Sequence, residues 1–433
     1  MHHGDPATPA NVYSLGMTDA DATGMRARLV RMTGRDPGER HRAATPLELL
    51  FDLSFVVAFG VASSQFAHLL AIGHLGEGLL GFGFAMFSIC WAWINFSWFA
   101  SAYDTDDWLY RVTTMVQMVG VIVLALGLPT LFHSIEEGGH IDNGIMVIGY
   151  VIMRVALIVQ WLRAANGDPQ RRRVALAYVG FVAAAQVGWV ALAVLHLDLV
   201  PTLVGASVLF LVELGGPVVA ERVGPGTPWH PHHIAERYAL LTIIALGEGV
   251  FGTVATVSAI IERQSWSVDA VVVIAAGIGL TFGLWWIYFM LPSGRLLALR
   301  PDRALRWGYG HILVFASIAA VGAGLHVAAY EIEGESTIGI SGSVLAVAIP
   351  VALFIAVAFT IYSDLVGEVD PFHVWPVAGS ITVLVVAVAL SMAGVGLAIC
   401  LLVITAAPAV VVVAYETVGW RHQTAALQRV TTR

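Results

Sequence analysis

The chain contains no lysine, so all 22 of its basic residues are arginine. Pyridoxal and retinal Schiff bases need a lysine amine, and a GxxxxGK[ST] phosphate loop needs a lysine too, so these chemistries are excluded. Cysteine is also scarce, with only Cys90 and Cys400. Neither belongs to a CxxC pair. We therefore expect no disulfide framework and no thiolate metal site, and we interpret both as small core residues.

Charged residues are also scarce. Of the 433 residues, 12% are charged and 58% are hydrophobic, and the mean hydropathy is +0.79. This composition excludes a water-soluble globule and predicts an all-α polytopic membrane protein whose first partner is the lipid bilayer. Nothing in it indicates a nucleic-acid partner or a cofactor. A spanning helix needs about 20 apolar residues. Twelve such runs occur, at 46–72, 78–101, 108–133, 143–165, 172–196, 199–220, 234–261, 268–291, 303–330, 337–363, 373–393 and 395–417.

The arginines predict the orientation, because basic residues near spans are retained on the cytoplasmic side. They concentrate before span one and after spans four, six, eight and twelve, whereas the opposite loops carry acids and only Arg263 breaks the pattern. Both termini are therefore expected in the cytoplasm. The arginines in question are Arg26, Arg28, Arg31, Arg35, Arg40, Arg42, Arg163, Arg171, Arg172, Arg173, Arg222, Arg237, Arg295, Arg300, Arg303, Arg306, Arg421, Arg429 and Arg433.

Weak internal similarity predicts two parallel six-helix repeats, 45–225 and 226–418, between a disordered tail at 1–44 and a C-terminal tail at 419–433. "WINF" at 93 matches "WIYF" at 286, "DWLYR" at 107 matches "DRALR" at 302, and "FDLSF" at 51 matches "GEGVF" at 247. Chance similarity between Trp- and Leu-rich helices is the alternative. A repeat of six spans would relate the halves by an axis near the membrane normal.

The third match aligns Asp52 with Glu248 and so predicts a carboxylate at one depth in each half, facing a shared interface. Arg154 and Glu213 are the other ionisable residues deep inside spans, and each is costly there unless it is paired, protonated or hydrated. One arginine cannot balance three acids, so at least one carboxylate is expected to be protonated or to hold a cation. The alternatives are structural: Arg154 as a counter-ion, and Glu248 kept neutral by hydrogen bonds between helices.

Two further features are expected to belong to the same interior. Glycines adjoin Glu213 and Glu248, where the backbone is expected to unwind or to approach a neighbour closely. His311 and Gln117 occupy matching places in the repeat and are expected to line that interior together.

The starts of spans one and seven carry polar residues with structural interpretations. Thr45 and Glu48 around Pro46 form a T-x-x-E capping box, so Glu48 is expected to seat the helix start. In "WHPHHIAER" at 229–237, proline is expected to begin the helix, with interfacial histidines and a structural role for Glu236 and Arg237. A metal site is the less favoured alternative, since its ligand set is incomplete. The residues of that alternative are His232, His233 and Glu236.

The motifs "TPLELLFDLSFVVAFG" at 45–60 and "ERYALLTIIALGEGV" at 236–250 resemble the low temperature requirement protein A family. The family's first motif reads closer to "ELFFDLVFV", so Leu50 and Ser54 depart from it. The resemblance implies a multi-pass protein of the bacterial plasma membrane, linked by name to growth in the cold. It brings no established substrate. The matching residues are Glu48, Phe51, Asp52, Glu236, Arg237, Gly247 and Glu248.

The leading functional hypothesis is an ion- or proton-coupled transporter, or a channel, whose interior polar site lies between the two halves. Asp52, Glu213, Glu248 and Arg154 would form it. The alternatives are a lipid-modifying membrane enzyme using the 230–236 cluster or the paired acids, and a scaffold or sensor. No enzyme is expected, because the sequence shows no nucleophile with a base and no complete metal set.

Overall fold

The computed structural model describes residues 29–39 and 42–432. Within them, twelve helices are long and apolar enough to cross a membrane, which confirms the predicted fold class. Each begins and ends within a few residues of its predicted run. They are α2 (Pro46–Ala71), α3 (Leu75–Tyr103), α4 (Trp108–Glu137), α5 (Gly144–Gly167), α6 (Arg172–Leu195), α7 (Leu199–Ala220), α8 (Pro231–Gln264), α9 (Val268–Phe289), α11 (Ala304–Glu333), α12 (Gly339–Val366), α13 (Val374–Met392) and α14 (Leu397–Ala414).

Short elements that hydropathy does not reveal join or extend these helices. The short helix α10 (Ser293–Leu299) and the turn η1 (Pro301–Arg303) connect α9 to α11, and the turn η2 (Pro371–His373) precedes α13. The chain then leaves α14 through a π-helical turn, η3 (Tyr415–Gly419), into the amphipathic helix α15 (Trp420–Thr432). Most of the predicted C-terminal tail is therefore helical.

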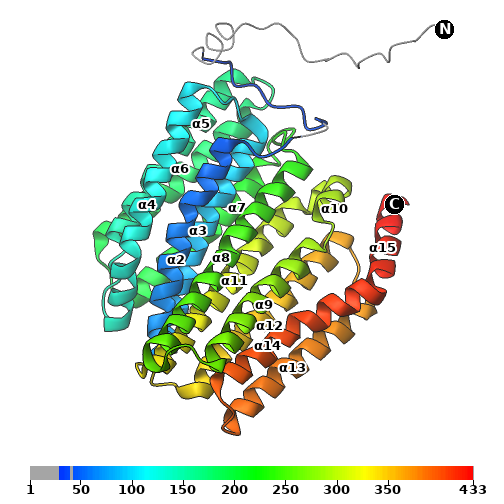
Figure 1. Ribbon diagram of the computed structural model, residues 1–433. Coiled ribbons are helices and arrows are strands. Elements are labelled where there is room, and N and C mark those ends of the chain that lie inside the picture. Colours follow the sequence, from blue (N-terminus) through cyan, green and yellow to red (C-terminus); the bar gives the residue numbers. More distant parts are fainter. Residues whose placement is uncertain (1–28, 40–41, 433) are drawn as a thin grey trace, which may run out of the picture.

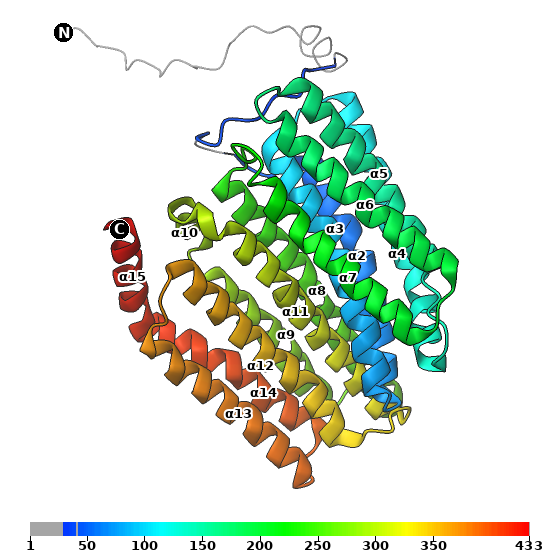
Figure 2. The ribbon, with the colours of Figure 1, turned by 180° about the vertical axis from the view of Figure 1, so that it is seen from behind.

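The helices form one bundle in which α8 and α11 lie between two groups (Figures 1 and 2). Helices α2 to α7 lie on one side, and α9, α12, α13 and α14 lie on the other. Helices α8 and α11 pack on each other and on α2 and α3. The contact between the first six spans and the last six is therefore made mainly by α2 and α3 against α8 and α11.

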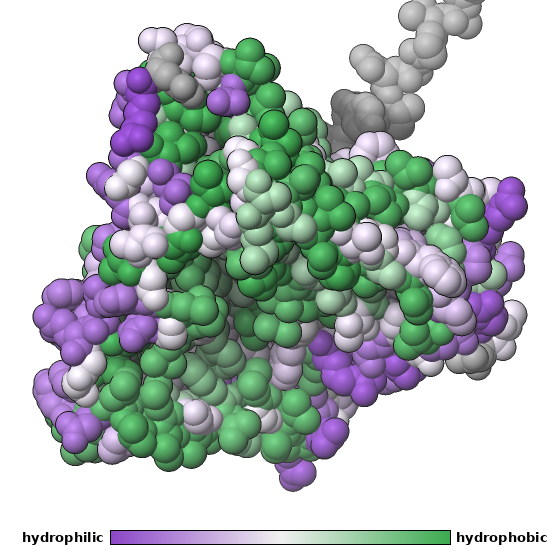
Figure 3. Space-filling model, turned by 90° about the horizontal axis from the view of Figure 1, so that it is seen from below, coloured by the Kyte–Doolittle hydropathy of each residue, from purple (hydrophilic) through white to green (hydrophobic). Residues whose placement is uncertain are grey.

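The outer surface of the bundle is apolar, as a bilayer requires. Large hydrophobic side chains are exposed on many helices, including Leu126 at 67%, Val187 at 72% and Val268 at 78%. Seen from below, hydrophobic residues cover much of the surface and hydrophilic ones gather in separate patches (Figure 3). Because several helices are apolar on all sides, hydropathy alone does not tell which face of a helix meets its neighbours.

Glycines let helices α4 and α5 cross at short distance. A Cβ placed on Gly149 of α5 would lie 2.3 Å from the backbone nitrogen of Leu124, and one on Gly127 of α4 would lie 2.4 Å from that of Met146. Such distances leave no room for a side chain. Close approach of backbones through small residues is a usual way for helices to associate in membranes.

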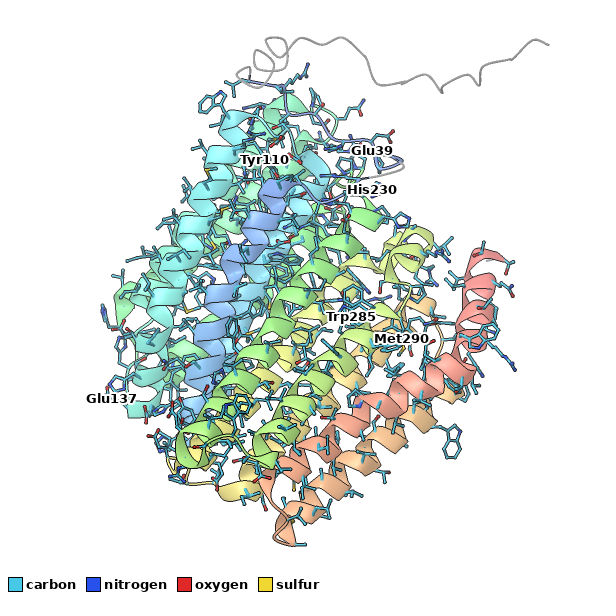
Figure 4. The ribbon with its side chains drawn as sticks, viewed as in Figure 1. Glu39, Tyr110, Glu137, His230, Trp285 and Met290 are labelled. Atoms are coloured by element: carbon cyan, nitrogen blue, oxygen red, sulfur yellow. The ribbon has the colours of Figure 1, made fainter. Side chains whose placement is uncertain are left out.

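The described part of the N-terminal tail packs on one end of the bundle. We call the end of the bundle where α2, α4 and α8 begin the arginine-rich end. Residues 29–39 run across it, and the backbone nitrogen of Arg35 donates to the carbonyl oxygen of Ala102 at 3.0 Å. The carbonyl of Glu39 lies 2.7 Å from Nε2 of His230 (Figure 4). Arg42 is buried and donates to the last carbonyls of α3. The remaining residues predicted to be disordered, 1–28 and 40–41, lie outside the described part.

Asp104, just after α3, gives this end a pH-dependent contribution to stability. Burial and, secondarily, the charge of Glu48 raise its pKa from 3.8 to about 6. A raised carboxyl pKa means that the ionised form opposes folding, so stability falls as the pH rises from about 4 to about 6. Asp104→Asn should therefore stabilise the protein at pH 7 by up to about 3 kcal/mol, a gain that vanishes near pH 4.

Thermal unfolding in detergent micelles between pH 4 and pH 8 measures this effect. The comparison variant is Asp106→Asn, which alters a more exposed carboxylate in the same loop. Parallel profiles for the wild type and Asp104→Asn would contradict the assignment.

Candidate functional site

The start of α2 places two acids on one face of that helix. The Thr45 hydroxyl accepts a hydrogen bond from the backbone nitrogen of Glu48 at 3.2 Å, and Glu48 accepts one from that of Thr45 at 2.8 Å. The predicted capping box is therefore present, with Pro46 at the first helical position. Asp52 lies one turn deeper on the same face. Both carboxylates are fully buried, at 0% exposure.

Arg237 faces these acids from inside α8. Pro231 begins α8, as the sequence predicts, and the helix starts early enough to carry Arg237 into its second turn. Arg237 is fully buried. Its second-turn position brings a guanidinium to the depth of the carboxylates on α2.

One guanidinium serves two carboxylates at this point. Arg237 donates to Asp52 through Nε at 3.1 Å and Nη2 at 2.5 Å, and its Nη1 lies 2.9 Å from Oε1 of Glu48. The indole nitrogen of Trp93, on α3, donates to Asp52 at 2.6 Å. His233 Nε2 lies 3.2 Å from Glu48. A planar guanidinium with several fixed donors suits this bridging position, which an ammonium would fill less well.

Helices α2 and α8 run in parallel with a constant register of 185 residues. Glu48 meets His233, Asp52 meets Arg237, and 11 residues further along each helix Ser63 meets Glu248. Asp52 and Glu248 are therefore not at one depth, which corrects the expectation drawn from the repeat alignment. At 1.5 Å per residue, they are separated by roughly 16 Å along the helices.

Glu248 lies about halfway along α8, where the two halves meet, and is 3% exposed. Its carboxyl is within hydrogen-bonding reach of the Ser63 hydroxyl. A Cβ on Gly60 of α2 would lie 3.4 Å from its Oε1, and one on Gly322 of α11 would lie 2.7 Å from its backbone. Among the described residues no arginine or histidine forms an ion pair with Glu248. It is the deep carboxylate that lacks a cation.

Arg154 and Glu213 form a separate cluster within the first half. The Tyr150 hydroxyl receives a hydrogen bond from Arg154 and donates to Glu213 at 3.1 Å, and Arg154 Nη2 lies 3.5 Å from Glu213. The indole of Trp91 donates to the same carboxylate at 2.7 Å. Arg154 is thus a counter-ion to one acid, in line with its structural interpretation. The four residues expected to form one site therefore lie at three separate places. Asp52 is with Arg237, Glu213 is with Arg154, and Glu248 is alone.

One glycine beside each acid allows close approach, and neither pair of glycines unwinds the backbone. Helix α8 is continuous through Gly247 and Gly249, and α7 is continuous through Gly215 and Gly216. A Cβ on Gly249 would lie 2.8 Å from the Thr281 hydroxyl of α9, and one on Gly216 would lie 2.9 Å from Phe181 of α6. The sequence allowed either an unwound backbone or a close approach between helices at these glycines, and the structure shows close approach.

Gln117 and His311 do not share an interior. Gln117, on α4, donates to Gln160 of α5 at 2.9 Å, within the first half. His311, on α11, has Nε2 3.1 Å from the Tyr288 hydroxyl and Nδ1 2.8 Å from the Trp307 carbonyl. Each is buried in its own half, which corrects the expectation that they face one another.

The histidines at the start of α8 point in different directions. His230 caps the helix by accepting from the backbone nitrogen of His233. His233 turns inward to Glu48, whereas His232 is exposed and lies beside Gly294 of α10. Glu236 is half-buried. Within residues 29–39 and 42–432, no three His, Cys, Asp or Glu side chains are grouped so that they would hold a metal ion.

Sequence reasoning missed the Arg237 pairing, although a signal for it is present. Each helix begins with proline and carries two polar residues one turn apart at the same spacing: Glu48 and Asp52 after Pro46, and His233 and Arg237 after Pro231. Acids on one helix and bases on the other, in one register, indicate parallel partners. Trp93 carries no comparable signal, because Trp91 and Trp98 lie close to it on the same helix.

Comparison with known proteins decides the family. The model of the bacterial low temperature requirement A protein family matches residues 43–414, which includes both acid and base motifs. The chain belongs to the LtrA family. An uncharacterised protein of Rhizobium meliloti (strain 1021) is 26% identical over 300 residues, covering 65% of this LtrA chain and 68% of that protein. No solved structure matches this LtrA protein.

Proposed function

We propose that this LtrA-family protein moves protons or small cations across the bacterial plasma membrane through the contact between its two halves. The observation that carries the proposal is the position of Glu248. This buried carboxylate has no cationic partner among the described residues and lies at the middle of α8, where α2 and α11 pack on that helix. An unpaired acid at such a depth costs several kcal/mol if ionised, so a functional role is its default interpretation.

The Asp52–Arg237 pair supports the same proposal from the arginine-rich end. It lies on the same helix faces as Ser63 and Glu248, three turns nearer that end. Phe55 and Phe59 are buried on the intervening turns of α2 and separate the two levels. Transport would therefore require α2 and α8 to move relative to one another, as alternating access requires of two halves.

Duplication and orientation are part of this proposal. The first and third long helices of each half pack together, as do the third and fourth: α2 with α4 and α4 with α5, then α8 with α11 and α11 with α12. This shared packing supports a repeat. The concentration of arginines at one end supports placing that end, and both termini, in the cytoplasm.

Flux measurements on the purified full-length protein in liposomes test the proposal. An internal pH dye and imposed proton, sodium and potassium gradients report movement of each ion. We expect Glu248→Gln, which keeps the side-chain shape, to lower the flux at least tenfold. The matched control is Glu262→Gln, which alters an exposed acid near the end of the same helix. Absence of flux for every ion, or unchanged flux in Glu248→Gln, would overturn the proposal.

A further inference from the structure

We infer that the species bound by Glu248 is a proton and that the site does not take a metal cation. This inference rests on the proposed function and identifies its substrate at that residue.

A metal cation needs several oxygen ligands around it, six to eight in the case of Ca²⁺. Among the described residues, the Ser63 hydroxyl is the side-chain oxygen within hydrogen-bonding reach of the Glu248 carboxyl. This hydroxyl also donates a hydrogen bond to the carbonyl oxygen of Ala319 at 3.3 Å. Helices α2, α8 and α11 are unbroken at this level, so each carbonyl oxygen already accepts a hydrogen bond within its helix and has only its second lone pair to offer. The site therefore offers too few ligands.

Space disfavours a metal ion for a second, independent reason. Gly60 and Gly322 bring α2 and α11 so close that a Cβ on Gly60 would touch Oε1 of Glu248, and one on Gly322 would collide with its Cβ. These contacts leave little room for a hydrated cation on the sides of the carboxyl that face α2 and α11. A proton needs none, because it bonds to the carboxyl oxygen itself.

No charged group faces Glu248 from the packed helices. Helix α2 presents Gly60 and Ser63, α11 presents Gly322, and α9 presents Thr281 to the adjacent Gly249. The nearest titratable residues along α2 and α11 are His68 and His326, each about one turn further on. Burying a lone carboxylate among such neighbours is far costlier than burying the neutral acid. The acid form is therefore the one that this packing accommodates.

A groove on the lipid side opens one residue along α8 from Glu248, whose carboxyl does not line it, so a small apolar reagent in the groove reaches the carboxyl when α2 and α8 move, as the proposed transport requires. The groove lies between α8 and α9 and is lined by apolar and aromatic side chains together with Gly247 and Thr281. Dicyclohexylcarbodiimide is such a reagent and reacts with protonated carboxyls. The acid proton moves to a carbodiimide nitrogen while the carboxyl oxygen bonds to the central carbon, so the adduct keeps every atom of both reactants.

The experiment labels the unaltered full-length protein with dicyclohexylcarbodiimide and locates the adduct by peptide mass spectrometry. We expect labelling at Glu248 that declines about tenfold for each pH unit above its titration point. Sodium, potassium or calcium chloride, compared with choline chloride at equal ionic strength and pH, should not change it. Asp52 and Glu48, paired with Arg237, are internal comparisons that should remain unlabelled, and Glu248→Gln should remove the labelled peptide.

Two results would overturn the inference. Protection of Glu248 by a metal ion at constant pH would show a cation site, and labelling that is absent or independent of pH would show a sealed structural acid. The experiment measures no flux, so the two proposals fail separately. If Glu248 is labelled as expected but no ion crosses the liposome membrane, the transport proposal alone is overturned. If sodium protects Glu248 from labelling and sodium flux is measured, the inference that the bound species is a proton is overturned, and the transport proposal stands.

Discussion

Replacing Arg237 by methionine is expected to destabilise the protein by about 3 to 5 kcal/mol, because it leaves two buried carboxylates without their shared cation. Both Glu48 and Asp52 have 0% exposure, so neither can recover its hydration without opening the contact between α2 and α8. His233 and Trp93 would each keep a contact with one of these acids, but neither replaces the guanidinium.

Thermal and denaturant unfolding in detergent micelles measure this loss. The triple variant Glu48→Gln, Asp52→Asn, Arg237→Met removes all three charges and should recover much of the stability, because the cost lies in the uncompensated acids. Arg295→Met, at an exposed arginine, is the control. A triple variant as unstable as Arg237→Met would show that the guanidinium acts mainly through packing.

Gly149→Val is expected to be the most damaging apolar substitution in the first half. Its Cβ would lie 2.3 Å from the backbone nitrogen of Leu124 and 2.6 Å from the Gly120 carbonyl oxygen, and neither backbone atom can move aside as a side chain would. Helices α4 and α5 would have to separate. The expected loss is about 3 kcal/mol or more, at or beyond the upper end of usual overpacking costs.

The matched control is Gly180→Val on α6, where a Cβ meets nothing within 4 Å and the residue is exposed. Both variants exchange the same residue types within a spanning helix, so they differ in packing alone. The yield of folded protein and its unfolding midpoint measure the effect. Equal losses in the two variants would contradict the importance of the α4–α5 contact.

The spans were predictable because a bilayer imposes the length and apolarity of each helix, and these are properties of consecutive residues. The capping box at Thr45 and the helix start at Pro231 were predictable for the same reason, since both are local. The pairing of Arg237 with Asp52 was not, because helices that are apolar on all faces carry no moment that reveals their orientation.

The neighbours of Glu248 could not be predicted from the sequence either. The depth of this residue followed from its position in the span, and composition indicated that one of three deep acids would be unmatched without saying which. Its neighbours Ser63 and Gly322 come from helices 185 and 74 positions away in the chain. The repeat alignment chose Asp52 as its counterpart on similarity alone. The register of α2 against α8, which depends on tertiary packing, gives a different partner.

The parallel contact between α2 and α8 also has a consequence for biosynthesis. Asp52 enters the membrane region with the first helix, whereas Arg237 is made 185 residues later. At about 5 to 20 residues per second, translation alone takes roughly 10 to 40 s to supply the missing cation. During that interval the nascent first helix must keep two acids near the headgroups or protonated. If the two acids stay ionised, the first helix can reach its final depth only when the seventh long helix supplies Arg237.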